Sequence, residues 1–70
     1  MQGGEILKRE WLIAYRKAKG LTQQDIAEIL NVNINTYSFY EQGLRRPSPK
    51  NAKRIAKILD FDWTKFYEGE

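Results

Sequence analysis

Three asparagines, Asn31, Asn33 and Asn35, interrupt a segment that is otherwise typical of helix. An asparagine side chain has both hydrogen-bond donors and an acceptor, so it can bond to the backbone or to the edge of a nucleic-acid base. Asn31 suits a left-handed turn residue, and Asn33 suits a helix N-cap. Asn35 is left on the outer face beside Thr36, where its amide can pair with two atoms of an adenine.

Basic residues follow this segment. Residues 42–57 contain no acid and carry Arg45, Arg46, Lys50, Lys53, Arg54 and Lys57. Residues 60–70 reverse the balance, with four acids against one lysine. The net charge is +3. A basic stretch before an acidic, aromatic tail predicts one surface for a polyanion and another for a different contact. A solvated helix face explains the charges about equally well.

The composition argues against several kinds of chemistry. The chain has no cysteine and no histidine, so we expect no disulfide, no metal site and no histidine acid–base catalysis. Asp25 and Glu28 form the only tidy carboxylate pair, and helix-start charge explains them better than catalysis. We therefore expect no enzyme and no cofactor. Neither a membrane span nor a signal peptide is evident, which predicts a cytoplasmic protein with no membrane contact.

The 70 residues contain five helical segments and no convincing strand, which predicts one all-α domain of five helices. The first helix is expected over about residues 5–19, and Gly20 ends it in a left-handed conformation. Its predicted apolar stripe comprises Leu7, Trp11, Ala14, Tyr15 and Ala18. Thr22 is expected to cap the second helix in an imperfect capping box with Asp25. Residues 1–4 are expected to be disordered or an artificial addition.

The later helices have equally local signals. The third is expected over residues 34–42, between the cap Asn33 and the stop Gly43. Ser48 and Pro49 start the fourth, whose buried stripe is Ala52, Ile55, Ala56 and Leu59. A short fifth helix is expected from about Asp62. Two short helices around a three-residue break predict a helix-turn-helix over about residues 22–42, in which Tyr37 and Tyr40 face inward.

The stretch LTQQDIAEILNVNINTYSFYEQG, with Arg16 before it and RRPSPKNAKRIAKILDFDWTKF after it, resembles the lambda-repressor-like (Xre) helix-turn-helix family. The resemblance covers roughly residues 6–67. Asn31 stands where the family usually has glycine, and Tyr37 is larger than its usual residue, so the hydroxyl of Tyr37 needs a partner or an exit to solvent. Segment 34–39 also lacks the glutamines and arginines that often read bases in the family.

The resemblance implies binding of double-stranded DNA. We expect phosphate contacts from Gln23, Arg45 and Arg46, with Lys17, Lys19, Lys50 and Lys53 as weaker candidates. The expected base-reading residues are Ile34, Asn35, Thr36 and Phe39, which together favour modest A·T preference. Phe39 has two equal interpretations, because it either faces DNA or flanks the core.

Two further expectations follow from the family. Arg16 and Glu41 are expected to form a largely buried ion pair that orients the recognition helix. The aromatic tail contains Phe61, Trp63, Phe66 and Tyr67. Some of these must close the core, and any surplus predicts a dimer contact. A homodimer on DNA implies a pseudo-palindromic operator with half-sites about 34 Å apart.

These features favour a sequence-specific transcriptional regulator, a repressor of prophage or bacterial type that associates with the nucleoid. Two alternatives stay open. One is an antitoxin-type DNA-binding protein, which the short segment after the fifth helix disfavours. The other is a protein-interaction module of the same fold without DNA binding, which the apolar pair Ile34 and Phe39 keeps open.

Overall fold

The computed structural model describes residues 8–68, which form four α-helices and one 3-10 helix. The elements are α1 (Glu10–Ala18), α2 (Gln23–Leu30), α3 (Ile34–Gln42), α4 (Pro49–Leu59) and η1 (Trp63–Tyr67). These residues contain no strand, which confirms the all-helical class. The last segment is a 3-10 helix where a fifth helix was expected. Expectations for residues 1–7 concern a part of the chain outside the described residues.

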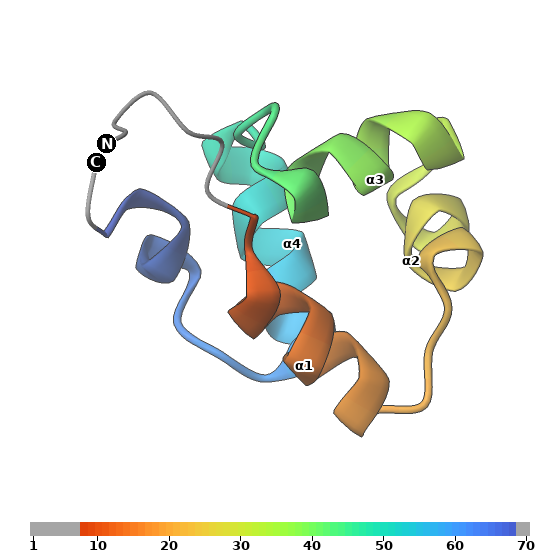
Figure 1. The fold of residues 1–70 in the computed structure, drawn as a ribbon, viewed down its shortest axis with the longest axis horizontal. Coiled ribbons are helices and arrows are strands. Elements are labelled where there is room, and N and C mark those ends of the chain that lie inside the picture. The colour runs from red at the N-terminus through yellow and green to blue at the C-terminus, as the bar shows by residue number, and fades with distance from the viewer. Residues whose placement is uncertain (1–7, 69–70) are drawn as a thin grey trace.

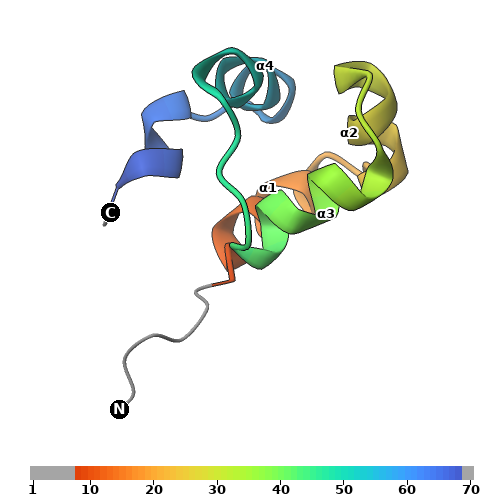
Figure 2. The same ribbon diagram turned by 90° about the horizontal axis from the view of Figure 1, so that it is seen from above.

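The helices surround a single apolar core. α3 contacts both α1 and α2, and α4 contacts α2 and η1. α1 and α3 lie in front of α4 in Figure 1 and on the side opposite it in Figure 2, and η1 contacts α4. The most deeply buried side chains come from every one of these elements: Leu12, Ile26, Tyr37, Ile55, Leu59 and Phe66.

Local capping explains where α2 and α3 begin. The Thr22 hydroxyl accepts a hydrogen bond from the Asp25 N–H at 3.1 Å, and Asp25 accepts one from the Thr22 N–H at 2.8 Å. This is a complete capping box, and the bond to the Thr22 backbone also lowers the pKa of Asp25. Asn31 turns the chain with φ 59°. Asn33 then caps α3 by accepting from the Asn35 N–H at 2.8 Å.

The second half of the chain begins its helices in the same way. Ser48 accepts from the Asn51 N–H at 3.3 Å, and Pro49 occupies the first turn of α4. The four residues of the expected α4 stripe are all buried. Asp60 ends α4 in a left-handed conformation with φ 65°, which the sequence pattern did not predict. Asp62 caps η1 through the Thr64 N–H at 3.0 Å.

The expected start of α1 was wrong. Lys8 and Arg9 are not helical, and α1 begins at Glu10. The Arg9 N–H donates to the Glu41 carbonyl at 2.8 Å. Its guanidinium donates to the Tyr40 carbonyl at 2.6 Å and to the Arg45 carbonyl at 2.8 Å. Arg9 therefore supplies donors to carbonyls at the end of α3, which a helix leaves without internal partners. The backbone of Arg9 takes a non-helical conformation in which it makes these contacts.

The expected buried face of α1 was also wrong in part. Leu12 is fully buried, whereas Ala14, Tyr15 and Ala18 are exposed. Leu12 and Arg16 lie four residues apart and therefore share a face of the helix. Because Arg16 must reach Glu41 on α3, α1 turns this face inward. Trp11 packs against the core from its edge.

In the described part of the chain, the Tyr37 hydroxyl has neither the hydrogen-bond partner nor the exit to solvent that the sequence predicted. Its side chain is fully buried. Within residues 8–68, no group meets full hydrogen-bond geometry with its hydroxyl, although the Glu41 carboxylate and the Arg16 guanidinium lie close enough to interact with it. Burial raises the pKa of Tyr37, and the neighbouring Glu41 carboxylate raises it further. A buried polar group without a partner costs about 1–3 kcal/mol of stability.

We expect the substitution Tyr37→Phe to stabilise the protein by about 1 kcal/mol, because it removes this unpaired hydroxyl and keeps the ring. Tyr67→Phe is the matched control. The Tyr67 hydroxyl donates to the Pro47 carbonyl at 3.1 Å, so its removal should destabilise the protein by about 0.5–1.5 kcal/mol. Thermal unfolding of both variants measures the two effects. A loss of stability in Tyr37→Phe would contradict the assignment of an unsatisfied hydroxyl.

Candidate nucleic-acid interface

The outer face of α3 carries the predicted base-reading residues. Asn35 is exposed, Thr36 is half-buried, and Ile34 is 38% exposed. Phe39 is also 38% exposed and does not belong to the core cluster, so it lies at the surface, and its contact with DNA stays a prediction. The structure thus presents an amide, a hydroxyl and two apolar side chains along one helix.

The opposite face of α3 is anchored in the protein. Tyr37, Tyr40 and Glu41 are buried there. Tyr37 and Tyr40 meet edge to face, with ring centroids 6.1 Å apart. A helix whose inner face is fully occupied cannot rotate without breaking these contacts. The orientation of Asn35 and Phe39 is therefore set by packing beneath them.

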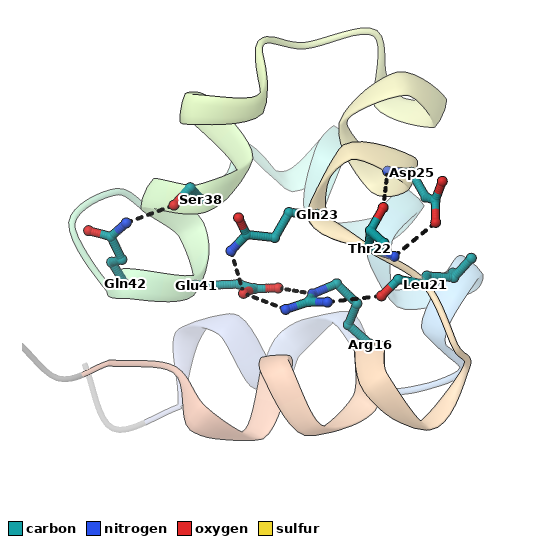
Figure 3. A network of polar contacts seen from close by, with 8 residues as sticks. All are labelled: Arg16, Leu21, Thr22, Gln23, Asp25, Ser38, Glu41 and Gln42. Atoms are coloured by element: carbon teal, nitrogen blue, oxygen red, sulfur yellow. Dashed lines mark hydrogen bonds and ion pairs between the residues drawn. The ribbon is translucent and has the colours of Figure 1, made fainter.

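A buried ion pair ties α3 to α1. Arg16 Nε donates to Glu41 Oε2 at 2.6 Å, and the Arg16 and Glu41 side chains are 11% and 2% exposed. A second guanidinium nitrogen lies 3.3 Å from Glu41 Oε1. The third guanidinium nitrogen donates to the Leu21 carbonyl at 2.9 Å, so the fork spans three points. Figure 3 shows Arg16 reaching from α1 across to Glu41.

Gln23 completes this network from the start of α2. Its amide nitrogen donates to Glu41 Oε1 at 2.9 Å (Figure 3). Burial pushes the pKa of Glu41 upward, but the hydrogen bonds from Arg16 and Gln23 outweigh it, and the pKa falls below its ordinary value. Glu41 is therefore ionised at neutral pH. The contact leaves Gln23 a second amide N–H that can donate to a phosphate, while its carbonyl oxygen can accept from water.

A hollow of about 690 Å³ lies beside the network, between α1, the start of α2 and the end of α3. Lys17, Gln23 and Gln42 contribute to its wall, together with Lys8 and Glu10. Lys17 is thus placed near Gln23, the expected phosphate ligand. Lys19, the other expected cation of this region, is exposed just after α1.

Arg45 and Arg46 are exposed on the connection between α3 and α4. The Arg46 guanidinium carbon lies 4.9 Å from the centroid of the Tyr67 ring. The backbone carbonyl of Arg45 accepts from Arg9. Both arginines therefore lie just after α3, on a segment that Arg9 contacts at Arg45 and Tyr67 contacts at Arg46.

Other members of the basic stretch are engaged within the protein. Arg54 donates to the Ile29 carbonyl at 2.8 Å and lies 3.5 Å from the Leu30 carbonyl, at the end of α2. The ammonium of Lys53 lies 4.9 Å from the Trp63 ring centroid. Sequence reasoning missed the helix-end roles of Arg9 and Arg54. No local signal marks them, because their partners are 24 to 36 residues away.

The aromatic tail is divided between core and surface. Phe66 is 1% exposed and closes the core, so it offers no surface for the dimer contact expected of it. Phe61, Trp63 and Tyr67 are half-buried against the core. Phe61 contacts Trp11 edge to face at 5.2 Å. The dimer expectation for these three residues stays a prediction.

The described residues contain neither a metal-binding cluster of acidic side chains nor a membrane-spanning helix. Across residues 8–68, no three acidic side chains gather where they could hold a metal ion. None of the helices in this range is long and apolar enough to cross a membrane.

The compact all-helical fold with short helices and tight turns is that expected of a helix-turn-helix protein. The sequence matches the helix-turn-helix family over residues 12–66. The chain belongs to this Xre-type helix-turn-helix family.

The chain is similar to three bacterial proteins. It is 39% identical over 62 residues to the uncharacterised HTH-type transcriptional regulator YqaF of Bacillus subtilis, covering 89% of this chain and 82% of YqaF. It is 40% identical to the regulator YqaE of the same organism, over 79% of this chain and 47% of YqaE. It is 34% identical to the antitoxin MqsA of Escherichia coli, over 80% of this chain and 42% of MqsA. The chain therefore spans less than half of the last two. No solved structure matches it.

Proposed function

We propose that this chain is a sequence-specific DNA-binding transcriptional regulator in which α2 and α3 form the helix-turn-helix and α3 enters the major groove. The observation that carries the proposal is the outward face of α3, with Asn35 exposed above a buried, ion-paired inner face. The Asn35 amide suits adenine, and Ile34 and Phe39 suit thymine methyl groups. This combination supports an A·T-leaning half-site.

The remaining contacts position the helix on the duplex. Arg45 and Arg46 follow α3 and are exposed, where they suit phosphates beside the groove. Gln23 and the free N–H groups at the start of α2 suit another phosphate. Lys17 and Lys19 extend this basic surface near the start of α2. The protein then acts in the cytoplasm, on nucleoid DNA.

We further propose that two copies bind a pseudo-palindromic operator, with their α3 helices about 34 Å apart. Phe61, Trp63 and Tyr67 are the surface residues that support a contact between copies, since each keeps part of its ring accessible. We propose repression of prophage or bacterial genes as the outcome of this binding. YqaF, called a transcriptional regulator, supports the regulatory role.

A second candidate is an antitoxin-type DNA-binding protein. The similarity to MqsA, which is named an antitoxin, favours it. It shares the proposed DNA surface with the leading candidate and adds a toxin partner. A third, a protein-interaction module, uses the exposed apolar residues Ile34 and Phe39 for a protein.

The salt dependence of DNA binding tests the proposal. Fluorescence anisotropy with a labelled duplex should show log K falling linearly with log salt between about 50 and 200 mM, with a slope of about −0.9 for each phosphate contacted. The substitution Arg45→Ala should reduce that slope by about 0.9 for each bound copy of the protein. Lys57→Ala is the charge-matched control, because Lys57 lies in the last turn of α4, away from the connection to α3. Absence of binding at about 50 mM salt would favour the protein-interaction module.

A further inference from the structure

The connection between α3 and α4 is fastened by a residue from the far end of the chain. Tyr67, the last residue of η1, donates its hydroxyl hydrogen to the Pro47 carbonyl at 3.1 Å. The face of the same ring lies beneath the Arg46 guanidinium, 4.9 Å from ring centroid to guanidinium carbon. One side chain thus holds both the backbone and a cation of the connection.

The Tyr67 ring is itself held in place. Trp63 meets it edge to face, with centroids 5.7 Å apart and an interplanar angle of 84°. Trp63 also packs against the core and lies under the ammonium of Lys53 at 4.9 Å. Two rings from η1, Trp63 and Tyr67, therefore pack against two cations. Arg46 comes from the connection and Lys53 from α4.

This arrangement restricts Arg46 while leaving it exposed to solvent. An arginine has high rotamer freedom, and a contact that orders it in advance reduces the entropy lost when it binds a partner. When a guanidinium lies over a ring, its N–H groups stay at the edge of the guanidinium plane, where they can donate to phosphate oxygens. Stacking on Tyr67 and binding of a phosphate are therefore compatible.

On the basis of the proposed function, we infer that Tyr67 is a positioning residue for DNA binding. It holds the α3–α4 connection so that Arg46 meets the phosphate backbone beside α3. The C-terminal segment η1 thereby contributes to DNA affinity without touching DNA, through Arg46 and Pro47.

Three variants test the inference in anisotropy titrations across the same salt range, using a duplex selected from random DNA by the wild-type protein. Tyr67→Leu removes both the ring and the hydroxyl, Tyr67→Phe removes the hydroxyl alone, and Arg46→Ala removes the cation. We expect Tyr67→Leu to reduce the salt slope by up to about 0.9 for each bound copy, as Arg46→Ala does. Tyr67→Phe should retain most of the slope because it keeps the stacked ring. The Tyr67→Leu and Arg46→Ala double variant should show little more loss than either single change, since they act on one contact.

The matched control is Tyr15→Leu, which changes an exposed tyrosine of α1 whose ring contacts those of Trp11 and Phe61. It should leave the salt slope unchanged. All titrations are made well below the melting temperature of each variant, so that lost stability does not imitate lost contacts. NMR gives a second measurement without DNA: the Arg46 side-chain protons should move on Tyr67→Leu, because the ring current is removed.

Because Tyr67 also belongs to the proposed contact between copies, the salt slope and the Arg46 NMR shifts, and not affinity alone, decide the inference. An unchanged salt slope in Tyr67→Leu, alongside a reduced slope in Arg46→Ala, would overturn the inference and leave the proposed function intact. An unchanged slope in Arg46→Ala would overturn it as well. Failure of the wild-type protein to bind any duplex at about 50 mM salt would overturn the proposed function, and the inference with it.

Discussion

Replacing Glu41 with alanine should destabilise the protein by about 3–5 kcal/mol, because it leaves the nearly buried Arg16 guanidinium without its carboxylate partner. The Gln23 amide loses its acceptor in the same step. For a domain of this size, each 1 kcal/mol shifts the melting temperature by about 4–8 °C. Total stability is commonly about 5–15 kcal/mol, so the variant should lie near the limit of folding.

Glu28→Ala is the control for this substitution. Glu28 is an exposed glutamate on α2 whose carboxylate accepts from Gln24 at 2.9 Å. Its removal should change stability by no more than about 0.5 kcal/mol. Thermal unfolding monitored by circular dichroism compares the two variants. Equal shifts in melting temperature would refute the special role of Glu41.

A double substitution separates the charge from the packing. Arg16→Met with Glu41→Leu replaces both charges by apolar side chains of similar size. Such replacements of buried ion pairs are often neutral or stabilising. We expect the double variant to be more stable than Glu41→Ala. If the ion pair orients α3, the double variant should bind DNA less specifically than the wild type. Selection from random DNA measures this specificity.

The same pair predicts how stability depends on pH. The pKa of Glu41 lies below its ordinary value of 4.5 in the folded protein. A carboxylate with a depressed folded pKa contributes stability above its unfolded pKa and loses it as pH falls through the folded pKa. The difference in melting temperature between wild type and Glu41→Gln should therefore be constant from pH 7 down to about 5 and shrink below pH 4.5. A difference that stays constant to pH 3 would contradict this linkage.

Asn35→Ala should have the second large effect, on recognition and not on folding. Loss of a two-point contact with a base is worth about 1–3 kcal/mol of discrimination, which corresponds to a roughly 5- to 150-fold change in affinity. Selection from random DNA should show one base-pair position losing its preference in each half-site. Because the Asn35 side chain is exposed, stability should change by less than about 0.5 kcal/mol.

Gln42→Ala provides the matched control for Asn35. Gln42 is an exposed carboxamide at the other end of α3, and its amide donates to the Ser38 hydroxyl at 2.7 Å (Figure 3). Its removal should leave base preference intact. Identical selected sequences from wild type and Asn35→Ala would remove Asn35 from the base-reading face.

The sequence predicted those features that depend on near neighbours. Thr22 with Asp25, Asn33 and Ser48 each act within three residues of themselves, so composition and spacing are enough to identify them. The outward position of Asn35 follows from helical periodicity once the cap is known. Most of α2, α3 and α4 could be predicted for this reason.

Features set by distant partners could not be predicted from the residues alone, and the Arg16–Glu41 pair was expected only through the family resemblance. Arg9 interrupts the start of α1 because of carbonyls more than 30 residues away, and nothing around it in the sequence indicates this. The rotation of α1 depends on where Glu41 stands, so Leu12 and not Tyr15 is buried. Among the tail aromatics, only packing distinguishes Phe66, which closes the core, from Tyr67, which reaches Pro47.

The arginines at the two helix ends have a consequence for engineering. Arg9 precedes the α2–α3 unit and binds the end of α3, while Arg54 follows the unit and binds the end of α2. The two helices are thus terminated by donors from outside their own segment, one from each flank. A graft of residues 22–43 into a foreign scaffold would leave both sets of terminal carbonyls open. A successful transplant needs a guanidinium supplied at each end by the host.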